Sequence, residues 1–103
     1  MHTLVVPPAA QRDNDAVQML SSWIAENGLR CSINVGLWHK NGKPELFAWG
    51  ILLADVVRHR SNAMGERYGA EPQETIDTVV SGLLAELENP TSAAHGTFSA
   101  GHS

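Results

Sequence analysis

The stretch Leu29-Arg30-Cys31-Ser32-Ile33-Asn34-Val35-Gly36-Leu37-Trp38 alternates between two kinds of side chain. Its odd-numbered residues are Leu, Cys, Ile, Val and Leu, and the others are polar, small or, at the end, tryptophan. Successive side chains of a strand point to opposite faces of a sheet, so this period of two predicts a half-buried strand. Cys31 falls on the apolar phase, and we interpret it as a small buried side chain rather than as a nucleophile.

The segment before this strand contains two expected elements. Residues 3–6 have the composition of a strand and stop at Pro7-Pro8, which cannot continue a ladder. Asp13 is a helix-capping residue type, and apolar residues then recur with helical spacing, which predicts a helix over residues 13–27 with Gly28 at its end. If the two strands pair across this helix, they run parallel with a right-handed crossover.

The segment after the strand begins with a tight-turn signal, Asn41-Gly42. Pro44 then suits the first position of a second helix, which we expect to run to Tyr68 with Gly69 as its end. The first half of this helix is apolar on almost every side. Such a pattern is typical of a central helix that packs on several neighbours.

A third helix is predicted from Pro72 to Glu88 and is ended by Asn89-Pro90. Its apolar residues form one complete amphipathic stripe. They are Ile76, Val79, Val80, Leu83, Leu84 and Leu87. Residues 91–103 are rich in Ser, Ala, Gly, Thr and His, which predicts a disordered tail.

The sequence therefore predicts a single α+β domain over residues 1–90, followed by the tail 91–103. The expected order is β-α-β-α-α, with a two-stranded sheet packed by three helices. Two strands alone leave both sheet edges open. Pairing of those edges between two copies would close them, so the pattern favours a homodimer.

Charge and composition exclude some classes of function. The chain has 103 residues, with seven basic and eleven acidic side chains and a net charge of −4. Its basic residues are scattered, whereas a nucleic-acid interface needs a basic patch. The longest apolar run, residues 47–54, is far short of the roughly 20 residues of a membrane helix. No basic, apolar leader opens the chain, and one cysteine cannot form an intrachain disulfide. We therefore expect a cytoplasmic protein that binds neither nucleic acid nor membranes.

Three polar residues of the second predicted helix form the candidate ligand-binding site. Asp55, Arg58 and His59 stand at i, i+3 and i+4, on one helix face. They suit a histidine that a carboxylate orients, acting as a general base or a metal ligand. They also suit an ordinary surface helix pair, and this structural interpretation is the favoured one. A zinc site needs three or four ligands, and this spacing supplies two at most, so no metal is predicted.

Other chemistry finds no support in the sequence. Glycine-rich phosphate loops, a nucleophile elbow, paired cysteines and the zinc-protease motif are all absent. We therefore predict no catalytic residue and no cofactor, and a protein that is more readily a binding protein than an enzyme. Trp38 lies on the polar phase of the strand. It is either a side chain of an interface or simply a partly exposed tryptophan.

The string Ala48-Trp49-Gly50-Ile51-Leu52-Leu53-Ala54-Asp55-Val56-Val57-Arg58-His59 is distinctive, as is the opening Val6-Pro7-Pro8-Ala9-Ala10. Together they resemble a family of short bacterial, mainly proteobacterial, proteins classed as a domain of unknown function. This resemblance implies a small single domain and no particular activity. Two hypotheses follow. The first is a non-enzymatic protein that acts through contacts with an unknown protein partner or as a homodimer. The second is a small-molecule or metal-binding protein whose site is centred on Asp55, Arg58 and His59.

Overall fold

A computed structural model describes residues 1–91 and 96–100 of the chain. The described residues fall into two compact units. The first holds residues 1–43 together with residues 96–100, and the second holds residues 44–91. Together they make a small α+β protein whose described part contains four helices and a three-stranded mixed sheet.

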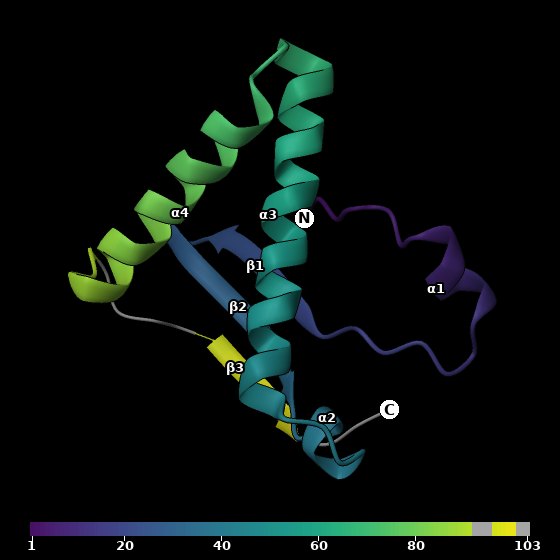
Figure 1. Cartoon of the computed structure of the whole chain (residues 1–103). Helices are drawn as coiled ribbons and strands as arrows, with labels where there is room; N and C mark the ends of the chain where they lie inside the picture. Colours follow the sequence, from purple (N-terminus) through teal and green to yellow (C-terminus); the bar gives the residue numbers. More distant parts are fainter. Residues whose placement is uncertain (92–95, 101–103) are drawn as a thin grey trace. The chain divides into compact units, whose positions relative to one another are not determined.

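The first unit is built on the sheet, whose strand order is β1-β2-β3. β1 (Leu20–Ala25) and β2 (Gly28–Val35) pair antiparallel, whereas β2 and β3 (Gly96–Ala100) pair parallel. Figure 1 shows β2 lying between the other two strands. Two short helices, α1 (Pro8–Arg12) and α2 (Leu37–Lys40), belong to the same unit.

A two-residue turn joins β1 to β2. Ala25 and Gly28 are the last facing pair of the ladder, and Glu26 and Asn27 lie between them with φ angles of 51° and 64°. Positive φ at both central residues is what a type I′ turn requires, and this turn matches the twist of the flanking strands. Asparagine tolerates this region of φ/ψ space much better than glutamate does.

The sheet has one apolar and one polar face. Facing residues of a ladder point to the same side, so the pairs Leu20–Ile33, Ser22–Cys31 and Ile24–Leu29 share a face, which Phe98 of β3 joins through its pairing with Ile33. The opposite face carries Trp23, Arg30, Ser32, Asn34 and Thr97. On that face the hydroxyls of Ser32 and Thr97 lie 3.1 Å apart and form a hydrogen bond.

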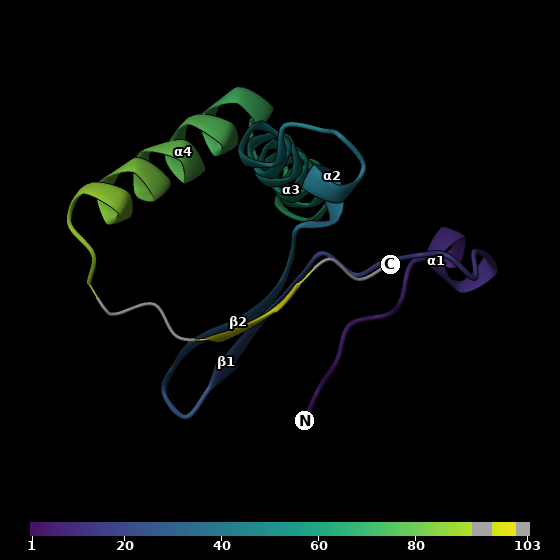
Figure 2. The same cartoon turned by 90° about the horizontal axis from the view of Figure 1, so that it is seen from below.

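The second unit is a helical hairpin. α3 (Glu45–Tyr68) and α4 (Pro72–Glu88) meet at the short loop between them and diverge away from it, as Figures 1 and 2 both show. Near the loop, the Ser61 hydroxyl donates a hydrogen bond to the Pro72 carbonyl oxygen at 3.1 Å. Ser61 is only 2% exposed, so its side chain is enclosed where this contact forms.

The predicted boundaries of these two helices are confirmed to within one residue, since α3 begins at Glu45 rather than at Pro44. Pro44 precedes α3 and Gly69, at φ 68°, ends it, while Pro72 begins α4 and Asn89 ends it. The strand predicted from Leu29 is also confirmed, although it ends at Val35. Gly36 then turns the chain with φ 92° into α2, so Trp38 lies in a helix and not in the strand.

The rest of the predicted order is wrong. Residues 20–25 form β1 instead of part of a helix over 13–27, because the chain reverses at Glu26 and Asn27 and pairs with β2. Residues 3–6 form no strand, and the sheet has three strands rather than two. The third strand, β3, lies in the segment that we expected to be a disordered tail. Residues 92–95 and 101–103 of that segment lie outside the described residues.

The apolar side chains of both units are poorly covered. Among the described residues no apolar side chain is buried, and the buried polar ones are Asn34 and Ser61. On α3, Leu46 is 90% exposed and Phe47 is 71% exposed. A neighbouring unit can only reduce exposure, so each unit taken alone covers these side chains no better. The expectation that α3 is a core helix with several neighbours is therefore not met within its own unit.

Candidate functional site

The three predicted ligand-binding residues lie together on α3. Asp55, Arg58 and His59 are all exposed, and they follow one another within about one helical turn. In the described part of the chain, no side-chain hydrogen bond or ion pair joins any of them to a neighbour. The structure therefore brings them to one stretch of helix surface without closing a pocket around them.

A metal centre has no obvious place in the described residues. Across residues 1–91 and 96–100, no three His, Cys, Asp or Glu side chains lie close enough together to hold a metal ion. Cys31 is a free thiol, half-buried on the apolar face of the sheet.

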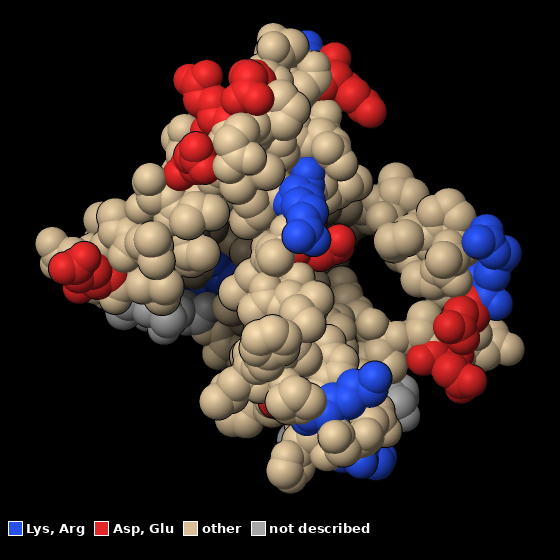
Figure 3. All heavy atoms as spheres, in the orientation of Figure 1, with Lys and Arg blue, Asp and Glu red and all other residues tan. Residues whose placement is uncertain are grey.

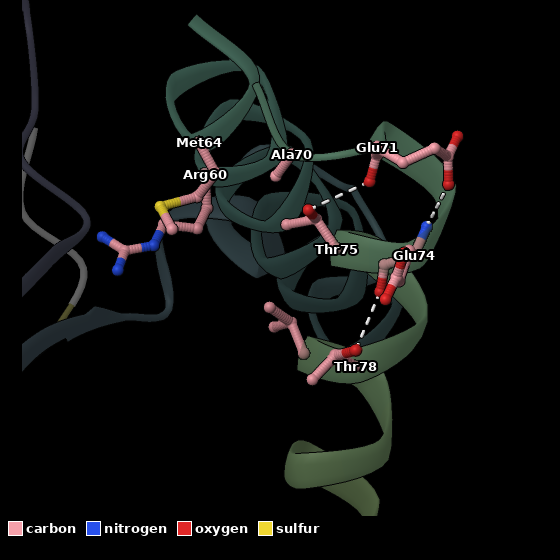
Figure 4. A pocket seen from close by; sticks show the side chains of 8 residues that line it. Arg60, Met64, Ala70, Glu71, Glu74, Thr75 and Thr78 are labelled. Carbon is pink, nitrogen blue, oxygen red and sulfur yellow. Dashed lines mark hydrogen bonds between the residues drawn. The ribbon is translucent and has the colours of Figure 1, made fainter. Parts of the chain in front are cut away.

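A groove of about 440 Å³ lies between α3 and α4, and its lining begins at Arg60, the residue after His59. Figure 4 shows Arg60 and Met64 on the α3 side and a row of acidic and threonine side chains on the α4 side. The Arg60 guanidinium points away from α4 in this view. The residues that line the groove are Arg60, Met64, Ala70, Glu71, Glu74, Thr75, Thr78 and Val79.

The polar groups of this groove are used mainly by α4 itself. The Glu71 carboxylate accepts hydrogen bonds from the backbone N–H groups of Gln73 and Glu74, at 3.1 and 2.7 Å. The hydroxyls of Thr75 and Thr78 donate to carbonyl oxygens one turn back in the helix. These groups stabilise the first turns of α4, so the groove offers a ligand few groups that are not already bonded.

Trp38, the predicted interface residue, is half-buried on α2. Its carbonyl oxygen accepts hydrogen bonds from the N–H groups of Asn41 and Lys43, at 3.1 and 2.7 Å. The backbone around it is thus part of a closed turn. Its role at an interface stays a prediction.

The sequence analysis missed the most distinctive surface of the first unit, the outer edge of β1. β1 is the first strand in the sheet order, so within the described residues its outer side faces no other strand. The segment Leu20-Ser21-Ser22-Trp23-Ile24-Ala25 contains no charged residue and no proline. The signal that could have revealed it is Asn27-Gly28 between two runs of apolar and small residues, which is typical of a hairpin turn.

The charged side chains do not gather into a basic surface. Figure 3 shows acidic side chains over the end of the hairpin where α4 begins, a region that carries Glu71, Glu74 and Asp77, while Lys and Arg side chains are scattered. Neither α3 nor any other described helix combines the length and the apolar character needed to cross a bilayer.

Comparisons with known proteins show a family and a fold. The protein-family model described as "Domain of unknown function (DUF5076)" matches residues 3–91. No curated protein matches the chain. A solved structure described as "Structure of a putative pyruvate dehydrogenase from the photosynthetic bacterium Rhodopseudomonas palustrus CGA009" is 23% identical to it. The match covers 91% of each chain with a TM-score of 0.67, and at this identity it shows the fold alone.

Proposed function

We propose that this chain, which belongs to the family described as a domain of unknown function (DUF5076), acts through protein contacts and first of all as a homodimer. The observation that carries this proposal is the exposure of its apolar side chains. Ile24, Leu46 and Phe47 are 86%, 90% and 71% exposed, and no apolar side chain is buried in the described part of the chain.

This exposure leaves each unit without a buried apolar core of its own among the described residues. A chain of about 100 residues is long enough to bury a hydrophobic core. Complete burial of one Leu, Ile or Phe side chain contributes roughly 1.5–3 kcal/mol, so exposed side chains of this kind are a large loss of stabilisation. Contiguous exposed apolar surface marks sites of contact with another protein.

A second copy is the partner that the surfaces favour most. Most soluble oligomers are homo-oligomers, and a two-fold dimer is by far the commonest form. The net charge of −4 opposes association only weakly. The charged residues lie outside β1 and outside the apolar stripe of α4, so like charges do not meet if two copies join there. Within this proposal the protein is a cytoplasmic bacterial protein, and Trp38 is a further candidate for the contact surface.

The concentration dependence of unfolding tests this proposal. A dimer that dissociates as it unfolds has a melting temperature that rises with protein concentration, because mass action favours the associated state. We expect the melting temperature to rise by several degrees across a hundredfold range of concentration. A constant melting temperature would overturn the homodimer. The Trp38→Ala variant is melted over the same concentrations. A smaller rise of its melting temperature than in wild type would show that this tryptophan contributes to the contact.

We propose as a second function the binding of a small ligand or a metal ion at Asp55, Arg58 and His59. What supports it is their shared place on α3, where all three side chains are exposed and unbonded in the described structure. Calorimetry with Zn²⁺ tests it on the full-length chain with His2, His95 and His102 replaced by alanine, so that terminal histidines cannot bind the metal. Stoichiometric binding that His59→Ala abolishes, with an unchanged melt, would support this function, and absence of binding would remove the metal version of it.

A further inference from the structure

Within the described residues, the outer edge of β1 presents a defined set of backbone groups that pair with no other strand. The Met19 carbonyl oxygen accepts a hydrogen bond from the Asn34 N–H at 3.0 Å, which extends the β1–β2 ladder by one pair. In an antiparallel ladder, inward- and outward-pointing residues alternate. Since residue 19 bonds inward, the N–H and C=O groups of Leu20, Ser22 and Ile24 point outward, away from β2.

β1 itself lacks three of the features that keep sheet edges apart. Natural edge strands are protected by charged side chains, by proline, by bulges or by a covering segment. β1 has no charged residue and no proline, and its register runs without a bulge from the pair Leu20–Ile33 to the pair Ala25–Gly28. An unprotected edge of this kind is a template for another strand.

We infer that β1 pairs antiparallel with β1 of a second copy, around a two-fold axis at Ser22. This inference rests on the proposed homodimer and names its surface. The register follows from two requirements. The outward-pointing groups of both copies must meet, and the apolar faces of the two sheets must lie on the same side. Several registers satisfy both, and the one with Ser22 opposite the partner's Ser22 and Leu20 opposite the partner's Ile24 pairs all three outward-pointing residues of each copy.

The pairing also covers an apolar side chain that the single chain leaves exposed. Ile24 is 86% exposed and lies on the apolar face of β1. In the inferred register Ile24 packs beside the partner's Leu20, and the two apolar faces become continuous. The edge supplies the hydrogen bonds and the register of this contact, and Ile24 adds apolar contact with the partner's Leu20.

A second copy of β1 also fits the edge better than the other strand-like segment of the chain, residues 3–6. The partner strand must be uncharged, of similar length and free of proline. Residues 3–6 also have strand-like composition, but Pro7-Pro8 follows them directly, so a strand there could pair over only part of the six-residue edge. The experiment must therefore distinguish two occupants of this edge, the partner's β1 and the partner's residues 3–6.

Disulfide trapping tests the register. Facing residues of a hydrogen-bonded antiparallel pair have Cα atoms about 5.5 Å apart, within the range that a disulfide spans. Ser22→Cys should therefore link two copies. Because Cys31 faces Ser22 within the same chain, the test is made with Cys31→Ala, which prevents an intrachain bridge. Ala25→Cys in the same background is the matched control, since the two copies of residue 25 would be roughly 20 Å apart along the strands.

We expect most of the Ser22→Cys, Cys31→Ala protein to run as a covalent dimer after mild oxidation at micromolar concentration, and the Ala25→Cys control to stay uncrosslinked. If wild type is dimeric but Ser22→Cys crosslinks no better than Ala25→Cys, the edge pairing is overturned and the homodimer stands. If wild type is monomeric by light scattering, both are overturned. A dimer that deletion of residues 1–6 abolishes would show that the partner's N-terminal segment occupies the edge, which also overturns the inference.

A charge on the same position gives an independent readout without oxidation. Ser22→Lys would place two like charges opposite each other at the two-fold axis and protect the edge. We expect it to weaken dimerisation about tenfold or more, whereas Ala25→Lys, with the same charge at the strand end, changes it by no more than about threefold. Equal effects of the two variants would contradict the inferred centre of the interface.

Discussion

Gly96, the first residue of β3, lies so close to Cys31 of β2 that a Cβ atom on residue 96 would overlap the Cys31 carbonyl oxygen. The same Cβ would be 2.8 Å from the Cys31 carbonyl carbon. The obstacle is backbone, which cannot move aside as a flexible side chain can. The parallel pairing of β3 with β2 therefore starts at a position that only glycine fills without a shift.

Gly96→Ala should consequently destabilise the sheet. Overpacking against well-ordered groups costs roughly 1–3 kcal/mol, and here the ladder must shift at its first pair. Gly82→Ala on α4 is the control, because a Cβ at that helical position meets nothing within 4 Å. Alanine there should raise the free energy of unfolding by up to about 1 kcal/mol. Denaturant titration measures the free energy of unfolding of both variants, which should fall for Gly96→Ala and rise for Gly82→Ala. If Gly96→Ala leaves it unchanged, β3 is not paired as described.

Glu26→Gly in the β1–β2 turn should stabilise the protein. Glu26 has a φ of 51°, a conformation that costs a residue with a side chain roughly 1 kcal/mol and costs glycine nothing. We expect the free energy of unfolding to rise by about 0.5–1 kcal/mol. The rise is smaller than the full relief of strain because glycine has greater entropy in the unfolded chain. Thermal melts measure it. A clear loss of stability would mean that the Glu26 side chain has a role that its exposed position does not reveal.

Ser61→Ala should weaken the α3–α4 hairpin by about 1 kcal/mol. The variant removes the hydrogen bond from the Ser61 hydroxyl to the Pro72 carbonyl oxygen, and bonds of this kind contribute roughly 0.5–1.5 kcal/mol. Ser61→Leu should cost more, since the site is 2% exposed and has no room for a larger side chain. Ser81→Ala on the exposed part of α4 is the control and should be neutral or slightly stabilising. If Ser61→Leu unfolds no more easily than wild type, the two helices do not meet at this point.

Glu71→Ala should destabilise α4 by roughly 0.5–2 kcal/mol, the usual effect of losing a helix N-cap. Its carboxylate accepts hydrogen bonds from the Gln73 and Glu74 N–H groups, which have no acceptor within the helix. Hydrogen exchange of these two amides should become faster. Glu66→Ala, which removes an exposed carboxylate from α3, should change stability by less than about 0.5 kcal/mol. Equal effects of the two variants would contradict the capping role.

The sequence predicted those elements whose ends carry local signals. Pro44, Gly69, Pro72 and Asn89 mark the ends of α3 and α4 through their own backbone preferences, which neighbouring elements do not change. The alternation that starts at Leu29 predicted β2 for the same reason. The two hairpin helices could thus be placed almost to the residue.

The sequence prediction failed where one signal has two meanings. A residue with positive φ ends a helix and also makes a tight hairpin turn, so Asn27-Gly28 was compatible with a helix end. The apolar spacing of Val17, Leu20 and Ile24 also fits a helix, yet Leu20 and Ile24 lie on the apolar face of β1. What decides between the two structures is pairing with β2, which a local pattern does not contain.

β3 could not be predicted for a related reason. Thr97 and Phe98 stand in a stretch of small and polar residues, and their partner in the ladder is more than 60 positions away, as the Ser32–Thr97 hydrogen bond shows. The candidate ligand-binding residues were predicted correctly to share a helix, since their spacing is local. Whether they bind a ligand stays a prediction, as do the single domain over 1–90 and the role of Trp38.

The molar mass of the wild-type chain in solution tests the central claim most directly. Light scattering after size exclusion, at micromolar concentration, should give twice the 11.1 kDa of one chain, because the proposed dimer joins two copies at the β1 edge. A mass of 11.1 kDa that does not change up to hundreds of micromolar would contradict the account.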